Sequence, residues 1–176
     1  MSTNTLELFR SNNAVQTEKF RKTVSSGFLF NIFLFTQLPM GYLAGLRVKE
    51  FTTSRCSVSV PYRWLNQNPF KSTYFAVLAM AAEMSTGMIA MMHTRDAKPS
   101  VSMLVTDVRG EFVKKATGIT IFTCEDAAAM LQTIEESVVS GEGKTYVCTS
   151  TGRNHAGEVI AKFTITWSFK ARTAKV

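Results

Sequence analysis

The chain has 176 residues, of which 45% are hydrophobic and 19% charged, a balance that fits one globular domain and excludes a disordered chain. The net charge is +7, but the basic residues are dispersed and form no nucleic-acid-binding motif, so we expect no nucleic-acid partner. Three scattered cysteines argue against a disulfide framework, and the N-terminus lacks the order of a secretory signal, so we expect a cytoplasmic protein.

The N-terminal part is predicted to form one helix over residues 14–36. Phe20, Val24 and Phe28 recur at every fourth position, with charged residues on the opposite face. Beyond Phe28 the apolar residues become continuous. We therefore expect this end of the helix to dock against another part of the protein.

Two strands, a polar loop and a second helix follow. Residues 46–51 and 56–60 are predicted strands, and the second of these alternates apolar and polar residues with period two. The polar loop 62–72 then leads to a long apolar helix over residues 74–92, which Ser72 or Thr73 can cap.

The helix over residues 74–92 has the length of a membrane span, but it carries Glu83 near its middle. A carboxylate at mid-span costs about 2.5–3.5 kcal/mol on insertion scales, and the Ala, Gly, Ser and Thr residues around it offer little to offset that cost. We therefore expect no transmembrane segment here, but a helix enclosed by protein on nearly all sides.

From residue 100 onward the pattern is that of strands. About four strands are expected, interrupted by an amphipathic helix over residues 125–139, which Thr123 and Asp126 precede in the manner of a capping box. The last strand alternates most regularly, with Ala161, Phe163, Ile165, Trp167 and Phe169 on one face. The whole order predicts a single α+β domain in which a curved antiparallel sheet wraps a long central helix.

Glu83 is the residue that we expect to carry chemistry. A carboxylate inside an apolar helix is costly unless it is paired, hydrated or functional. Burial would raise its pKa toward the range that suits a general base or acid near neutral pH. The alternatives are an ion pair with Arg95 or Lys71, or a place in a dimer interface.

The stretch from Asn68 to Glu83, NPFKSTYFAVLAMAAE, resembles the signature of hotdog-fold acyl-CoA thioesterases. In that family an Asn is followed six residues later by His-Gly-Gly at the start of the central helix, and an Asp or Glu follows nine residues after the His. Asn68, Tyr74 and Glu83 stand at those spacings. The wider chain resembles the subgroup with a DUF4442 domain, which implies one hotdog domain over residues 1–176, with an extra N-terminal helix (14–36) and a hotdog core (44–172).

The resemblance implies roles for individual residues. Glu83 would be the general base or nucleophile, and Asn68 would position water or substrate. The backbone N–H groups of Phe75 or Ala76 would polarise the thioester carbonyl. The sequence departs from the family at this point, because Tyr74-Phe75-Ala76 stands where the family has His-Gly-Gly.

Further contributions are implied from outside the central helix. Some family members add a Ser or Thr from the following strand, and Ser100 and Ser102 lie near that place. The substrate would be an acyl-CoA, no separate cofactor would be needed, and the protein would form a homodimer or a dimer of dimers with its active sites at the interface. The candidates for binding the coenzyme A phosphates are basic residues: Arg63, Lys71, Lys114 and Lys115.

Other readings remain open. A non-catalytic acyl-binding hotdog module would explain the altered His-Gly-Gly position. A hotdog dehydratase or hydratase also uses a helix Glu, but its His-Phe-Pro-Gly turn is absent from this sequence. Cys56, Cys124 and Cys148 lack a recognisable nucleophile environment, and no spacing of ligands predicts a metal site.

Overall fold

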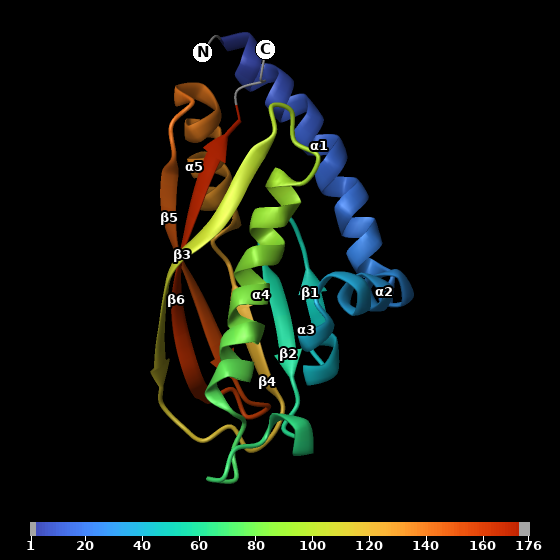
Figure 1. Cartoon of the computed structure of the whole chain (residues 1–176), viewed down its shortest axis with the longest axis vertical. Coiled ribbons are helices and arrows are strands. Elements are labelled where there is room, and N and C mark those ends of the chain that lie inside the picture. Colours follow the sequence, from blue (N-terminus) through green and yellow to red (C-terminus); the bar gives the residue numbers. More distant parts are fainter. Residues whose placement is uncertain (1–2, 173–176) are drawn as a thin grey trace.

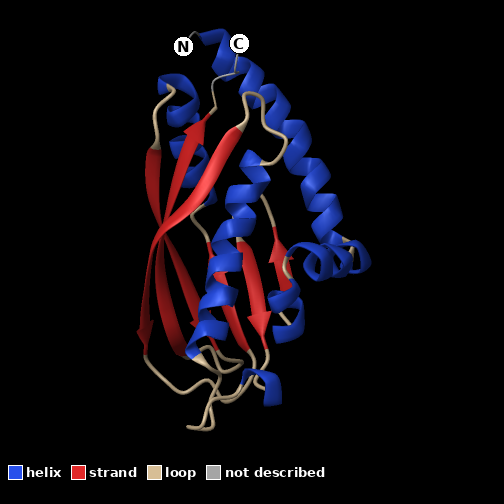
Figure 2. Ribbon diagram, viewed as in Figure 1, coloured by secondary structure: helices blue, strands red, loops and turns tan. Residues whose placement is uncertain are grey.

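The computed structural model describes residues 3–172 and is drawn in Figures 1 and 2. Its helices and strands alternate in the order that the sequence predicts, apart from the N-terminal part. The elements, in chain order, are α1 (Thr3–Ser25), α2 (Gly27–Gln37), α3 (Pro39–Ala44), β1 (Arg47–Phe51), β2 (Cys56–Val60), the short 3-10 helix η1 (Trp64–Asn66), α4 (Phe75–Thr94), β3 (Val101–Phe112), β4 (Thr120–Cys124), α5 (Ala127–Ser140), β5 (Lys144–Arg153) and β6 (Val159–Ala171).

The strands form one antiparallel sheet in the order β1-β2-β4-β5-β6-β3. The sheet curves around α4, and α1 runs beside the C-terminal end of α4 (Figure 2). The sheet is not closed, so β1 and β3 are its two edges. This arrangement confirms the expected hotdog architecture.

The helix α4 forms the centre of the core. Most of its side chains are buried, and apolar residues of β6, among them Phe163, Ile165 and Phe169, are buried with it. Polar contacts also join the helix to the sheet: the hydroxyls of Ser85 and Ser150 lie 2.7 Å apart, Trp167 Nε1 donates to Thr86 Oγ1 at 2.9 Å, and the Thr94 hydroxyl donates to Met103 Sδ at 3.2 Å. The helix is long and apolar enough to cross a membrane, but its burial is that of a core helix.

The predicted single helix over residues 14–36 is wrong, because the chain bends at Ser26 and forms two helices. Ser26 has an extended backbone, with φ −80° and ψ 99°. Phe20 and Val24 are buried as expected, but Phe28 lies beyond the bend and is 75% exposed. The apolar end does dock, but through a different face of α2, the one that carries Phe30 and Leu34.

Two predicted helix caps also differ from the structure. The side chain of Asp126, at the start of α5, does not cap its helix, because its Oδ2 accepts the backbone N–H of Thr149 on β5 at 2.7 Å. The residue before α4 is Tyr74, and no side chain caps that helix. The Thr73 hydroxyl instead donates to the carbonyl of Ala116 at 3.1 Å. In both places a tertiary contact replaces the local one.

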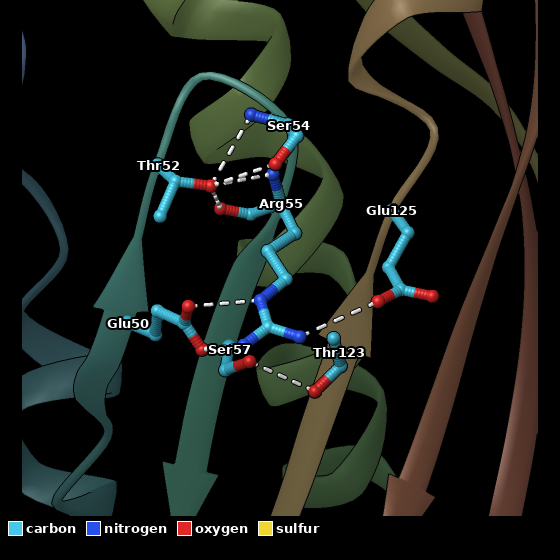
Figure 3. Close-up of polar contacts among 7 residues, drawn as sticks. All are labelled: Glu50, Thr52, Ser54, Arg55, Ser57, Thr123 and Glu125. Atoms are coloured by element: carbon cyan, nitrogen blue, oxygen red, sulfur yellow. Dashed lines mark hydrogen bonds and ion pairs between the residues drawn. The ribbon is translucent and has the colours of Figure 1, made fainter.

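A polar network fixes the β1–β2 hairpin to its neighbour (Figure 3). The guanidinium of Arg55 makes two contacts with Glu50, at 2.8 and 2.7 Å, and reaches Glu125 at 3.6 Å. Below it, the hydroxyls of Ser57 on β2 and Thr123 on β4 lie 2.9 Å apart. The charge of Glu50 is therefore matched within its own hairpin.

His93, near the end of α4, is a structural histidine. Its Nδ1 lies 3.2 Å from Asn13 Oδ1, while Asn13 Nδ2 donates to the His93 carbonyl at 2.9 Å. Its Nε2 is buried and has no partner among residues 3–172. Burial lowers the pKa of His93 from 6.5 to about 4, because a proton on this ring would place a charge in the core.

This burial predicts a loss of stability in mild acid. Since the pKa is lowered on folding, the contribution of His93 is complete above pH 6.5 and is lost as the pH falls toward 4. Between pH 7.5 and 5 the free energy of unfolding should fall by about 2 kcal/mol, which urea unfolding would measure. The variant His93→Gln cannot titrate and should show a correspondingly flatter profile. Identical profiles for the two proteins would contradict a buried neutral histidine.

Candidate functional site

A surface cavity of about 770 Å³ lies at the start of α4. The loop before the helix and the segment after β3 line it, and aromatic rings form much of its wall. The rings of Tyr74 and Phe75 meet edge to face with centroids 4.8 Å apart, and Phe75 and Phe112 do so at 6.4 Å. Leu78, one turn into the helix, adds further apolar surface. We call this space the mouth cavity.

Asn68 lines the mouth cavity and also shapes its loop. Its side-chain oxygen accepts the backbone N–H groups of Phe70 at 3.0 Å and Ser72 at 3.3 Å, and the Ser72 hydroxyl at 3.3 Å. The amide nitrogen makes no hydrogen bond within the described part of the chain. The side-chain oxygen of Asn68 is thus used within the turn, while its amide nitrogen is free to donate a hydrogen bond.

Two backbone N–H groups are free at the start of α4. The carbonyl of Tyr74 accepts from Val77 and Leu78, but the N–H groups of Phe75 and Ala76 find no acceptor among residues 3–172. Unsatisfied donors in the first turn carry partial positive charge and favour an oxyanion or a carbonyl oxygen. Both donors are therefore free in the described chain, and their role as oxyanion donors stays a prediction.

Asn66 was not singled out from the sequence, although it lies in the same loop. It is buried, and its Nδ2 donates to the carbonyls of Ala44 and Pro61, both at 2.8 Å. Its own carbonyl accepts the N–H of Tyr74 at 2.7 Å. Asn66 thus ties α3 and the end of β2 to the start of α4, and so fixes the position of the mouth.

Glu83 lies in a different place. It borders a small cavity of about 60 Å³ whose other lining side chains are apolar: Phe33, Leu38, Met84, Met88, Met91, Met103 and Trp167, with Gly87. The Glu83 carboxylate forms no hydrogen bond or ion pair within residues 3–172, although the Glu83 backbone carbonyl accepts the Thr86 hydroxyl at 2.9 Å. Arg95 and Lys71, which the sequence offered as ion-pair partners for Glu83, do not contact it: Arg95 contacts Asp96 at 3.8 Å, and Lys71 is on an exposed turn. Burial raises the pKa of the Glu83 carboxyl above its ordinary value.

Gly87 makes room for this carboxylate. A Cβ atom on Gly87 would lie 3.0 Å from Glu83 Oε1 and 3.2 Å from the ring of Trp167. The glycine one turn after Glu83 therefore lets the carboxylate and the indole pack beside each other. Sequence reasoning missed this residue; its only signal is the four-residue spacing from Glu83.

The mouth cavity and Glu83 are not brought together within one chain. The cavities share no lining residue, and Glu83, which follows Phe75 by eight positions, lies about 12 Å further along the helix. The candidate serines join neither cavity: Ser102 Oγ donates to the carbonyl of Lys170 at 3.0 Å, and Ser100 is exposed in the loop before β3.

The four basic residues that were predicted to bind the coenzyme A phosphates do not lie together. Lys114 and Lys115 line the mouth cavity, where Lys114 lies 2.6 Å from Glu158 and Lys115 donates to the carbonyl of Phe70 at 3.2 Å. Arg63 does not line it and donates instead to the carbonyl of Leu43. Lys71 is close in sequence but does not line the cavity either.

The described residues offer little support for thiol or metal chemistry. Cys56, Cys124 and Cys148 are all buried, and burial raises the pKa of the Cys56 thiol, which disfavours the reactive thiolate. Within residues 3–172 no group of three or more His, Cys, Asp or Glu side chains could hold a metal ion.

The comparisons agree with this fold. The family model DUF4442, a domain of unknown function, matches residues 28–169. A protein of unknown function from Pseudomonas aeruginosa, described as a "probable thioesterase", superposes with a TM-score of 0.71 at 19% identity, over 81% of this chain and 95% of that one. A thioesterase from Haemophilus influenzae superposes with a TM-score of 0.61 at 9% identity, over 83% and 91%.

A protein of unknown function from Chlorobaculum tepidum is also similar, with a TM-score of 0.70 at 14% identity, over 83% of this chain and 97% of that one. A search of curated proteins finds no match to the chain. At these identities the solved structures establish the fold, and the family model establishes membership. The chain belongs to the DUF4442 family and has the hotdog fold of its thioesterase-like structural neighbours.

Proposed function

We propose that this protein hydrolyses acyl thioesters and that acyl-CoA is its class of substrate. The observation that carries the proposal is Glu83, an ionisable side chain held in an apolar cavity with no partner in the described chain. Such a group lowers stability when it ionises, and a raised pKa suits a general base. The thioesterase-like fold supplies the class of reaction.

The chemistry divides between two groups of atoms. The free N–H groups of Phe75 and Ala76 donate to the thioester carbonyl oxygen and stabilise the oxyanion as it forms. Glu83 takes a proton from water as the water oxygen attacks the carbonyl carbon. The C–S bond then breaks, the acid product forms, and the thiolate leaves and receives a proton. Direct attack by the Glu83 carboxylate, with an anhydride hydrolysed afterwards, uses the same groups.

Because one chain separates these groups, we propose that each site is assembled by two subunits. β3 has an unpaired edge and exposes Leu104, Val108 and Phe112, which are 66%, 48% and 52% exposed. A long exposed edge strand is a template for pairing with a second copy. In a β3–β3 homodimer, the mouth of one subunit would work with Glu83 of the partner subunit, and Lys114 and Lys115 at the mouth would meet the coenzyme A phosphates.

The variant Glu83→Gln tests the base. Loss of a general base should reduce turnover by about 10²-fold or more. Turnover is measured as the release of free thiol from a panel of acyl-CoAs. Glu142→Gln, an exposed residue beyond α5, serves as the control. Full turnover in Glu83→Gln would remove Glu83 from the mechanism. Acyl-CoA binding without turnover in the unmodified protein would favour the non-catalytic acyl-binding module.

The same variant should be more stable at neutral pH. The raised pKa means that the folded protein prefers the neutral acid, so Glu83 costs nothing at low pH and destabilises as the pH rises through its folded-state pKa. Glutamine stays neutral throughout. Thermal unfolding at pH 8 should show the gain, which should vanish near pH 4; each kcal/mol raises Tm by about 2–4 °C.

Gly87→Ala should lower turnover more than stability. The added methyl group would displace the Glu83 carboxylate, whereas the better helix propensity of Ala offsets packing loss by about 1 kcal/mol. We expect about a tenfold fall in kcat with little change in unfolding free energy. Gly118→Ala, where a Cβ meets open space, should change neither. Unchanged kcat in Gly87→Ala would mean that the position of the carboxylate is not critical.

A complementation experiment tests the two-subunit site. Phe75→Pro deletes one N–H donor at a helix position where proline is tolerated, and Phe75→Ala, which keeps the N–H, controls for the lost ring. Heterodimers of Phe75→Pro and Glu83→Gln would contain one intact site, so random mixing should restore about one quarter of the activity. If the mouth and Glu83 of the same subunit act together, mixing would restore none.

A further inference from the structure

The helix α2 exposes an apolar surface that the fold does not use. It contains no charged residue, and only Phe30 and Leu34 are buried. Its other side, together with α3, presents large side chains that are 46–75% exposed. In Figure 1, α2 projects outward beyond β1, away from the curved sheet. We call this surface the α2–α3 patch; it consists of Phe28, Leu29, Ile32, Phe35, Met40 and Leu43.

Basic residues flank the patch along the chain. Residues 19–82 contain eight Lys or Arg and one acidic residue, Glu50, a net charge of +7, so the other residues sum to zero. Glu50 is held by Arg55. Lys22, near the end of α1, is exposed and lies 3.9 Å from Glu18. Arg47, on the neighbouring strand, is also exposed and lies 6.0 Å from the centre of the Tyr42 ring on α3.

A groove of about 340 Å³ separates α2 from the edge strand β1. Arg47, Lys49 and Glu50 line it from the strand, and Asn31 lines it from the helix. The side-chain oxygen of Asn31 is buried and has no partner within residues 3–172. Cations and an amide thus border a recess directly beside the apolar patch, as an anionic headgroup next to acyl chains would require.

We propose that the α2–α3 patch binds the surface of an anionic lipid bilayer, with its apolar side chains in the interface and the surrounding cations on the lipid headgroups. The 11 residues of α2 span about 16 Å, too short to cross a bilayer, so the helix lies in the plane of the membrane. A second copy of the chain fits this surface less well than a bilayer does, because a two-fold contact would place the same cations against one another.

The test uses the full-length chain and vesicles of phosphatidylcholine, with or without one third phosphatidylserine. We expect sedimentation with the anionic vesicles, weakening as salt is raised. The double variant Phe28→Ser/Phe35→Ser should lower the partition coefficient at least about tenfold, and Arg47→Gln/Lys49→Gln should lower it several-fold. Leu8→Ser/Val15→Ser, at residues of α1 that are 54% and 66% exposed, is the matched control and should bind like the unmodified protein.

Three results would overturn the proposal: no binding to anionic vesicles, equal binding by Phe28→Ser/Phe35→Ser, or self-association of the free protein that this variant abolishes. Circular dichroism and unfolding free energy confirm that each variant folds. The inference is independent of the proposed hydrolysis, since Glu83→Gln should bind vesicles normally. Loss of vesicle binding and loss of thioester turnover can therefore be told apart.

Discussion

The burial of α4 is the constraint on which the rest of this structure depends. An apolar helix of 20 residues is not stable in water, and here the sheet and α1 pack against it, while Phe33 of α2 lines a cavity beside its middle. Enclosure then determines the character of its one carboxylate. Glu83 is neither paired nor fully hydrated, so burial raises its pKa, and the protein keeps a group that its own core disfavours. Stability and reactivity are therefore opposed at the same residue.

The same helix supplies two different chemical environments. Its first turn opens to a cavity with free N–H groups and nearby lysines, while its middle is apolar and holds the carboxylate. A rigid helix fixes the distance between them at about 12 Å. A small substrate carbon cannot reach both within one chain, and this separation is the reason that the proposed site draws on the exposed edge of β3.

The sequence predicted most of the fold because alternation and helical periodicity are direct consequences of burial on one face. The alternating residues of β6, such as Phe163 and Ile165, are buried as expected. The break at Ser26 was missed because the four-residue spacing of Phe20, Val24 and Phe28 runs through it unchanged. Gly87 and Asn66 were missed for another reason: their roles come from contacts with Trp167 and with Ala44, and local patterns carry no trace of such distant partners.

The two faces of α2 show the limit of such reasoning most clearly. Phe33 helps to line the cavity of Glu83, whereas Phe35, two residues later, is 64% exposed. Both are phenylalanines in an uninterrupted apolar run, so hydrophobicity alone cannot tell the shielding side from the free side. Only the packing of α2 on α4 separates them. One side of α2 thus lines the Glu83 cavity while the other presents a free apolar surface, so a partner on its outer face would bear on the wall of that cavity.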